Sequence, residues 1–231
     1  MNPIIGYLLI VLLGYLIGSS NLAYYMARRR GINIYQKGSG NPGASNAMML
    51  MGWKTGILVG AHDIGKAVLA ALLCGLLFPG LPLCREIGGV ACVLGHMFPF
   101  YLGFRGGKGF ASSLGVIAVL NWRFALVLVV AIAVLVLITD YIVVGTMATV
   151  VSYPVYCLAT HQFLAAVLLA AVAVIIIYIV TKGVTCCGVL ETDSCSDVAG
   201  EYFVDLLTLI SVHLNDTSDT LLLVLGRIEN V

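Results

Sequence analysis

The chain has 231 residues, of which 61% are hydrophobic and only 10% are charged, and its mean hydropathy is +1.05. Soluble domains carry roughly 25% charged residues, so this composition excludes an ordinary soluble protein and indicates an integral membrane protein. The formal net charge of +1 indicates neither an acidic nor a basic partner, and we expect no nucleic-acid partner.

Long apolar stretches follow one another along the chain, and their continuous rather than alternating pattern predicts helices. The first lacks the charged start and the cleavage site of a signal peptide, so we expect it to be retained. The fourth is only about 14 Å long as a helix, too short for a full bilayer unless the protein is locally thin or the segment is re-entrant. The segments lie at residues 3–26, 54–79, 87–103, 112–120, 123–139, 142–160 and 163–181.

The predicted fold class is therefore an all-α integral membrane protein, a bundle of about seven transmembrane helices with Gly-rich cytoplasmic loops. Lysines and arginines between the segments set its orientation. One side would carry Arg28, Arg29, Arg30, Lys37, Lys54, Arg105, Lys108 and Lys182, and the other only Arg85 and Arg123. The positive-inside rule places the basic side in the cytoplasm and the N-terminus outside.

Two domains are expected, a polytopic membrane domain over residues 1–185 and a more acidic cytoplasmic tail of uncertain structure over 186–231. The cysteines lack the spacing of a zinc site, so no metal or other cofactor is indicated. Cys74, Cys84, Cys92 and Cys157 are expected to be small residues that pack between helices.

The first Gly-rich loop, KGSGNPGASN, has the G-x-G-x-x-G spacing of a dinucleotide site at Gly38, Gly40 and Gly43. No strand precedes it, so we interpret this spacing as a coincidence. Its glycines still allow backbone N–H groups to approach an anion closely. Hydrogen bonds to a polar ligand would come from Ser39, Asn41, Ser45 and Asn46.

The second loop, GHMFPFYLGFRGGKGFAS, combines two positive charges, Arg105 and Lys108, with a flexible backbone at Gly106, Gly107 and Gly109. This composition suits a phosphate, although the spacing is not that of a Walker A loop. The alternative is a turn between helices that carries two cytoplasmic charges.

Three further polar residues lie within apolar segments. His96 is either a hydrogen-bonded packing residue or a group that contacts substrate or shuttles a proton. Asp63 and Lys66 share one face of a helix, where they form either a neutralising pair or a substrate contact.

Together these residues resemble the bacterial acyl-phosphate:glycerol-3-phosphate acyltransferase family (PlsY). GSGNPGASNAMM is similar to the family's GSGNxGATNxxR, and GHMFPFYLGFRGGKGFA to GHxFPxxLxFKGGKGxA. Residues 63–67 resemble its D-x-x-K-G element and residues 139–146 its TxYxSLGS element. The resemblance covers roughly residues 1–181.

The resemblance implies seven transmembrane helices in a bacterial plasma membrane, with an active site that faces the cytoplasm. It implies transfer of a fatty acyl group from acyl phosphate to the 1-hydroxyl of sn-glycerol 3-phosphate, without a cofactor. Membrane lipids would surround a monomer. We expect Ser39, His96 and Lys108 to be catalytic. Substrate would be bound by Asn41, Ser45, Asn46, Asp63, Lys66, Arg105, Gly106, Gly107, Gly109 and Thr146.

The chain departs from the family pattern at three places. Met49 replaces an arginine, Val143 replaces a serine, and residues 178–187 lack the family's HRxNIxRLxxGxE motif. One hypothesis is that the tail is frame-shifted, which sequencing of codons 175–195 would test. The alternative functions are a catalytically impaired paralogue that binds a phosphorylated glycerolipid precursor and a small-solute transporter.

Overall fold

The computed structural model describes residues 2–139 and 142–189. The chain divides into two units, Met1–Ser196 and Asp197–Val231, and the second unit lies outside the described residues. Most of the expected tail, and with it the frame-shift hypothesis, therefore falls beyond the part of the chain that can be described.

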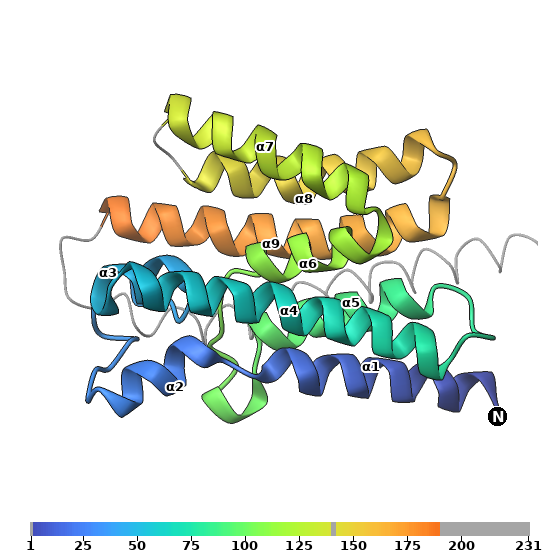
Figure 1. Cartoon of the computed structure of the whole chain (residues 1–231), viewed down its shortest axis with the longest axis horizontal. Helices are drawn as coiled ribbons and strands as arrows, with labels where there is room; N and C mark the ends of the chain where they lie inside the picture. The colour runs from blue at the N-terminus through green and yellow to red at the C-terminus, as the bar shows by residue number, and fades with distance from the viewer. Residues whose placement is uncertain (1, 140–141, 190–231) are drawn as a thin grey trace, which may run out of the picture. The chain divides into compact units, whose positions relative to one another are not determined.

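The described residues form α-helices and one 3₁₀ turn, without a strand, which confirms the all-α prediction (Figure 1). The helices are α1 (Pro3–Ser19), α2 (Leu22–Arg29), α3 (Ala44–Met51), α4 (Trp53–Leu77), α5 (Cys84–Met97), α6 (Phe110–Leu120), α7 (Trp122–Thr139), α8 (Ile142–Ala159) and α9 (Phe163–Val189), and the 3₁₀ turn is η1 (Phe100–Leu102). Three stretches of the described chain are long and apolar enough to span a membrane, Pro3–Arg29, Trp53–Leu77 and Phe163–Thr181, and the other apolar helices are shorter.

The first apolar segment is broken into α1 and α2 rather than continuous. Asn21 stands at the break, where its side-chain oxygen accepts the N–H of Tyr24 at 2.9 Å and caps α2. In the third apolar segment the α-helix ends at Met97, two residues before Pro99. A proline disfavours the helical conformation of the residue that precedes it. Both interruptions lie next to the Gly-rich loops.

Helices α1 and α5 form the tightest contact of the described bundle. A Cβ atom at Gly14 would collide with the carbonyl of Gly88, one at Gly18 with the carbonyl of Cys92, and one at Gly95 with the carbonyl of Tyr15. Small residues allow membrane helices to approach this closely. Cys74, Cys84, Cys92 and Cys157 are buried free thiols, as expected of packing residues.

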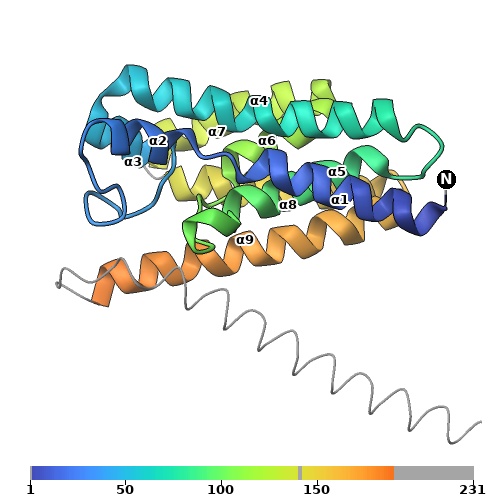
Figure 2. The same ribbon diagram turned by 90° about the horizontal axis from the view of Figure 1, so that it is seen from below.

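Helices α4, α6 and α9 pack against this pair. Helix α4 packs on α1, α5 and α6, and α9 packs on α5 and α8. Figure 2 shows α4 and α9 on opposite sides of α1 and α5. Helix α2 continues in the direction of α1 and α4 runs back, which leaves α2 and α3 at one end of the bundle (Figure 1).

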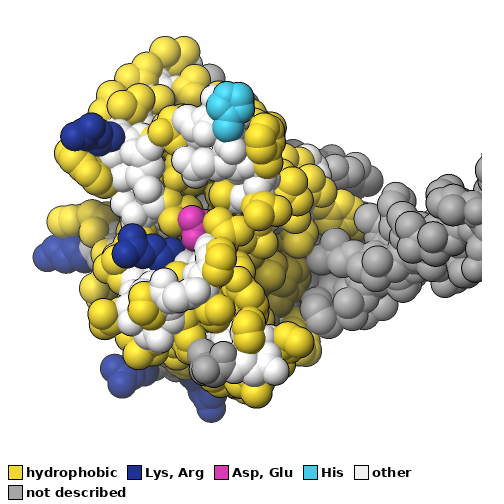
Figure 3. Space-filling view, turned by 90° about the vertical axis from the view of Figure 1, so that its right-hand side faces the viewer, with side chains coloured by type: hydrophobic (Ala, Val, Ile, Leu, Met, Phe, Trp, Pro, Cys, Tyr) yellow, Lys and Arg dark blue, Asp and Glu magenta, His cyan; other side chains and the backbone are white. Residues whose placement is uncertain are grey.

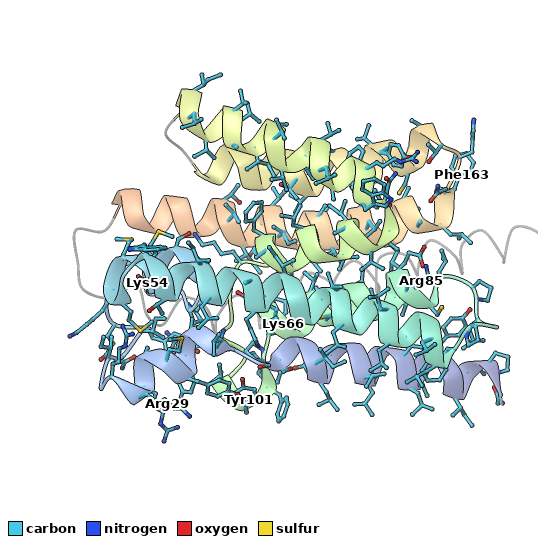
Figure 4. All side chains as sticks on the ribbon, viewed as in Figure 1. Arg29, Lys54, Lys66, Arg85, Tyr101 and Phe163 are labelled. Atoms are coloured by element: carbon cyan, nitrogen blue, oxygen red, sulfur yellow. The ribbon has the colours of Figure 1, made fainter. Side chains whose placement is uncertain are left out.

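Basic residues are distributed unequally between the two ends. Arg29 and Lys54 lie at one end, with Arg85 and Phe163 at the other (Figure 4). The end that carries Arg85 is mostly hydrophobic, with isolated basic side chains and an acidic one (Figure 3). The loops at residues 30–43 and 103–109 follow helices that run toward the Arg29 end.

Candidate functional site

A buried polar cluster joins α4 to α5 in the middle of the apolar bundle. Lys66 Nζ lies 3.0 Å from Asp63 Oδ1 and 2.8 Å from His96 Nδ1. The three side chains are only 3–6% exposed. The sequence placed Asp63 and Lys66 on one helix face, and the structure adds His96 to them.

The break between α1 and α2 supplies further partners to this cluster. Lys66 Nζ donates to the carbonyl of Ser20 at 2.6 Å, a carbonyl at the point where the helix is interrupted. His62 Nε2 lies 3.2 Å from Ser20 Oγ, and its Nδ1 lies 3.4 Å from Asp63 Oδ1. A buried charge is tolerated only when it is paired and hydrogen-bonded, and here the broken helix completes the pairing.

The same break also holds both Gly-rich loops in place. Asn21 Nδ2 donates to the carbonyl of Pro42 in the first loop at 3.1 Å. Tyr101, in η1 just before the second loop, donates its hydroxyl to the carbonyl of Ser19 at 2.7 Å. Figure 4 shows Lys66 and Tyr101 near the middle of the bundle, close to this break.

The second loop lies directly on His96. Gly106 N–H donates to the carbonyl of Met97 at 2.9 Å, and Gly107 N–H donates to the carbonyl of His96 at 3.1 Å. A Cβ atom at Gly107 would collide with Nε2 of the His96 imidazole. These two glycines therefore let the loop approach His96, and their N–H groups are already used.

The donors left for an anion lie at the start of α6. Gly109, with φ of +85°, is the N-cap of α6 and provides no side-chain cap. The first N–H groups of a helix have no partner within it, and the helix dipole favours an anion there. Lys108 immediately precedes this cap, half-buried, and no described residue forms an ion pair with its ammonium.

Two buried polar atoms beside this helix start lack a partner. Arg105 Nε and Ser112 Oγ have no hydrogen-bond partner among the described residues, and Ser112 is 0% exposed. Buried polar atoms are usually hydrogen-bonded, so such orphans commonly mark a position that a ligand or water fills. The region of Arg105 to Ser112 therefore has the positive charge, the N–H donors and the unsatisfied groups that a phosphate requires.

Asn46 holds the first loop together. Its side-chain oxygen accepts the N–H of Ser39 at 3.0 Å, and its Nδ2 donates to the carbonyls of Ile34 and Lys37 at 3.2 and 3.1 Å. Ser39 and Ser45 are exposed and Asn41 is half-buried. The side chain of Asn46 is thus fully occupied within the loop, whereas the two serines remain accessible.

Tyr35 connects the two loops. Its hydroxyl donates to the carbonyl of Arg105 at 2.7 Å, and the Arg105 guanidinium lies 5.0 Å above its ring. Burial raises the pKa of Tyr35 to about 12, although the nearby Arg105 charge lowers it. The phenol therefore stays protonated at neutral pH and can donate this bond.

The structure thus brings Asp63, Lys66 and His96 together, and it places the second loop against them. The side chain of Thr146 lies outside the described residues. Sequence reasoning missed Ser20, Asn21, Tyr35 and Ser112; only Asn21 had a clear signal, as a helix-capping residue inside an apolar run. No cluster suited to a metal occurs in the described part of the chain.

Comparison with known proteins places the chain in a family. The family model described as glycerol-3-phosphate acyltransferase matches residues 8–183. The glycerol-3-phosphate acyltransferase of Shouchella clausii (strain KSM-K16) is 38% identical over 162 residues, which cover 69% of this chain and 79% of that one. Glycerol-3-phosphate acyltransferase 1 of Deinococcus radiodurans is 48% identical over 117 residues, 49% of this chain and 57% of that one.

Solved structures agree with this match. PlsY (YgiH), an integral membrane glycerol 3-phosphate acyltransferase, superimposes in its glycerol 3-phosphate form with a TM-score of 0.72. It is 28% identical, and the match covers 78% of this chain and 91% of that one. The lysophosphatidic acid form gives a TM-score of 0.70. The chain is an integral membrane protein of the glycerol-3-phosphate acyltransferase family, as the motifs predicted.

Proposed function

We propose that this protein transfers a fatty acyl group from acyl phosphate to the 1-hydroxyl of sn-glycerol 3-phosphate, forming lysophosphatidic acid and inorganic phosphate for phospholipid synthesis. Membership of the family supports acylation of glycerol 3-phosphate. The fold shared with PlsY supports acyl phosphate as the donor. No cofactor enters the proposal.

The observation that carries this proposal is the start of α6. Lys108 precedes an uncapped helix N-terminus, and Arg105 Nε and Ser112 Oγ beside it lack partners. A phosphate would accept bonds from these donors and satisfy the orphaned groups. The proposed phosphate contacts are therefore Arg105, Lys108, the N–H of Gly109 and Ser112, while Gly106 and Gly107 shape the loop.

The chemistry requires positioning more than covalent catalysis. Acyl phosphate is a mixed anhydride, so the acceptor hydroxyl can attack its carbonyl carbon directly. An ester bond forms as the bond between the acyl carbon and the phosphate oxygen breaks, and the proton of the hydroxyl leaves on the released phosphate as hydrogen phosphate. Fixed positive charge near the phosphate stabilises the charge that develops there. Ser39, Asn41 and Ser45 of the first loop would bind the donor or the acceptor.

The sidedness of the reaction follows from the charge distribution. The Arg29 and Lys54 end of the bundle would face the cytoplasm of a bacterial plasma membrane, with the N-terminus outside. Both substrates would then reach the loops from the cytoplasm, with the acyl chain in contact with membrane lipid. We propose that the protein acts as a monomer.

A donor comparison tests the proposal. The purified protein in detergent is given radiolabelled glycerol 3-phosphate with acyl phosphate, acyl-coenzyme A or acyl carrier protein, and lysophosphatidic acid and free phosphate are measured. We expect equal amounts of both products with acyl phosphate alone. Product only with a thioester donor would overturn the assignment of the donor. Binding of glycerol 3-phosphate without product from any donor would identify a catalytically impaired paralogue instead.

A further inference from the structure

The ammonium of Lys66 has no donor left for a substrate. An ammonium carries three N–H groups, and three acceptors surround this one: the Ser20 carbonyl at 2.6 Å, His96 Nδ1 at 2.8 Å and Asp63 Oδ1 at 3.0 Å. Lys66 is only 6% exposed and Asp63 only 3%. A direct substrate contact by either side chain would require one of these bonds to break.

This arrangement fixes the tautomer of His96. Two groups face Nδ1 of His96, the Lys66 ammonium at 2.8 Å and Asp63 Oδ1 at 3.5 Å. The ammonium is the nearer group and can only donate, so Nδ1 accepts from it and carries no proton. The proton of the neutral imidazole then lies on Nε2. Nε2 is the imidazole atom that approaches Gly107, because a Cβ atom at Gly107 would collide with it. An N–H donor therefore faces the loop that precedes Lys108.

We propose that His96 serves as a neutral hydrogen-bond donor to the substrate phosphate at the second loop, and that Lys66 and Asp63 are positioning residues that hold its Nε2–H tautomer. This inference rests on the proposed function, since it names a further contact in the same phosphate site. It excludes a general-base role for His96. A general base needs a free lone pair directed at the substrate. The only basic lone pair of this neutral imidazole is on Nδ1, and it faces Lys66.

The tautomer can be measured without any turnover. The chain has four histidines, and selective ¹⁵N-histidine labelling of the purified protein in lipid, with His96→Gln to assign the signal, reports which nitrogen carries the proton. We expect the His96 signal of a neutral ring with its proton on Nε2. Glycerol 3-phosphate or inorganic phosphate should shift the Nε2–H resonance. A proton on Nδ1, or a ring that shows no response to either anion, would overturn the proposal.

Two isosteric variants separate the possible roles of His96. The amide of His96→Gln reaches the Nε2 position and keeps a neutral donor there, whereas His96→Asn keeps an acceptor for Lys66 but is too short to reach the loop. We expect His96→Gln to remain within a few-fold of wild type and His96→Asn to raise the KM for one phosphate substrate at least about tenfold. Comparing the KM for acyl phosphate with that for glycerol 3-phosphate identifies which phosphate His96 contacts.

Other kinetic results for the two His96 variants would contradict the proposal, and each would indicate a different role for His96. Loss of kcat by about a hundredfold or more in both variants would indicate a general base. Wild-type behaviour of His96→Asn would indicate that the imidazole only accepts from Lys66. If the wild type gives no product with any donor, the proposed function fails, but binding of glycerol 3-phosphate and of inorganic phosphate to the two variants still decides the inference. Weaker binding of either anion in His96→Asn alone supports it, and equal binding of both anions by the two variants overturns it.

The role of Lys66 as a positioning residue has its own readout. In Lys66→Met the N–H that holds Nδ1 is absent, so the ¹⁵N signal of His96 should change to a mixture of tautomers. A signal that keeps the Nε2–H form would show that Lys66 does not position the ring. Should Lys66→Met fail to fold, the two His96 variants still decide the substrate contact.

Discussion

Asn46 Oδ1 accepts the backbone N–H of Ser39 at 3.0 Å, which ties the first turn of α3 back to the middle of the first loop. Asn46 also donates to the carbonyls of Ile34 and Lys37, and it is 0% exposed. One buried amide thus determines the shape of the loop that presents Ser39 and Ser45.

Replacing Asn46 should therefore affect stability before it affects chemistry. Asn46→Ala leaves buried groups unpaired, which typically costs about 1–3 kcal/mol each, so we expect a clear fall in thermal unfolding midpoint together with lost activity. Ser45→Ala is the matched control, because Ser45 is exposed in the adjacent position. It should leave the midpoint unchanged and raise a substrate KM. A stable but inactive Asn46→Ala would instead point to a direct substrate contact.

Gly107 should tolerate no side chain. In Gly107→Ala the added methyl group would collide with the His96 imidazole, so the loop must move away from α5. We expect turnover to fall by at least about tenfold, as a displacement near 1 Å can cost more than this. Gly65→Ala, where nothing lies within 4 Å of the new methyl group, is the control and should keep full activity. Normal turnover in Gly107→Ala would show that the close approach is dispensable.

Tyr35→Phe removes the hydrogen bond to the Arg105 carbonyl but keeps the ring beneath the guanidinium. We expect a loss of about 1 kcal/mol of stability at neutral pH. Burial raises the pKa of Tyr35 from 10.0 to about 12, so the protonated form is favoured on folding. The stability advantage of wild type over Tyr35→Phe should thus be constant below pH 10.0 and shrink as pH rises toward about 12. An advantage that grows with pH over this range would contradict the assignment.

Met49 offers a gain-of-function test. It stands where the family pattern has an arginine, and it is 72% exposed on α3, so a longer charged side chain can be accommodated. We expect Met49→Arg to lower the KM for a phosphate substrate several-fold, in keeping with a charge-assisted hydrogen bond, with the gain reduced by salt. Met49→Gln, which adds polarity without charge, should show no gain. An unchanged KM in Met49→Arg would mean that position 49 lies away from the substrate.

The helices could be predicted from the sequence because their signal is local. Apolar runs between polar breaks located the helical segments, and the charges at 28–30, 54 and 85 predicted which ends lie together. The interruption at Asn21 was not predicted from the sequence. The helix prediction relied on the length of the apolar segment, and one capping residue within that segment does not shorten it. Helix α9 continues to Val189, beyond the apolar segment predicted at residues 163–181.

The sequence predicted many of the residues that form the site but not the contacts between them. The motifs identified Asp63, Lys66 and His96, yet only the packing of α4 on α5 shows that Lys66 faces His96. Glycines 106 and 107 suggested phosphate-binding N–H groups, whereas the fold uses those N–H groups to hold the loop on α5. Long-range contacts such as that between Tyr35 and Arg105 leave no periodic pattern in a single sequence.

Lys108 provides the most direct test of the account. Formation of lysophosphatidic acid from acyl phosphate and glycerol 3-phosphate is measured for wild type, Lys108→Ala and Lys54→Ala. Lys54 is exposed at the same basic end of the bundle but lies over Trp53, away from the second loop. If phosphate binds at the start of α6, Lys108→Ala should lose at least about a hundredfold in kcat/KM, consistent with loss of a charge contact in the transition state, and Lys54→Ala should stay near wild type. Equal activity of Lys108→Ala and Lys54→Ala would contradict the proposed site.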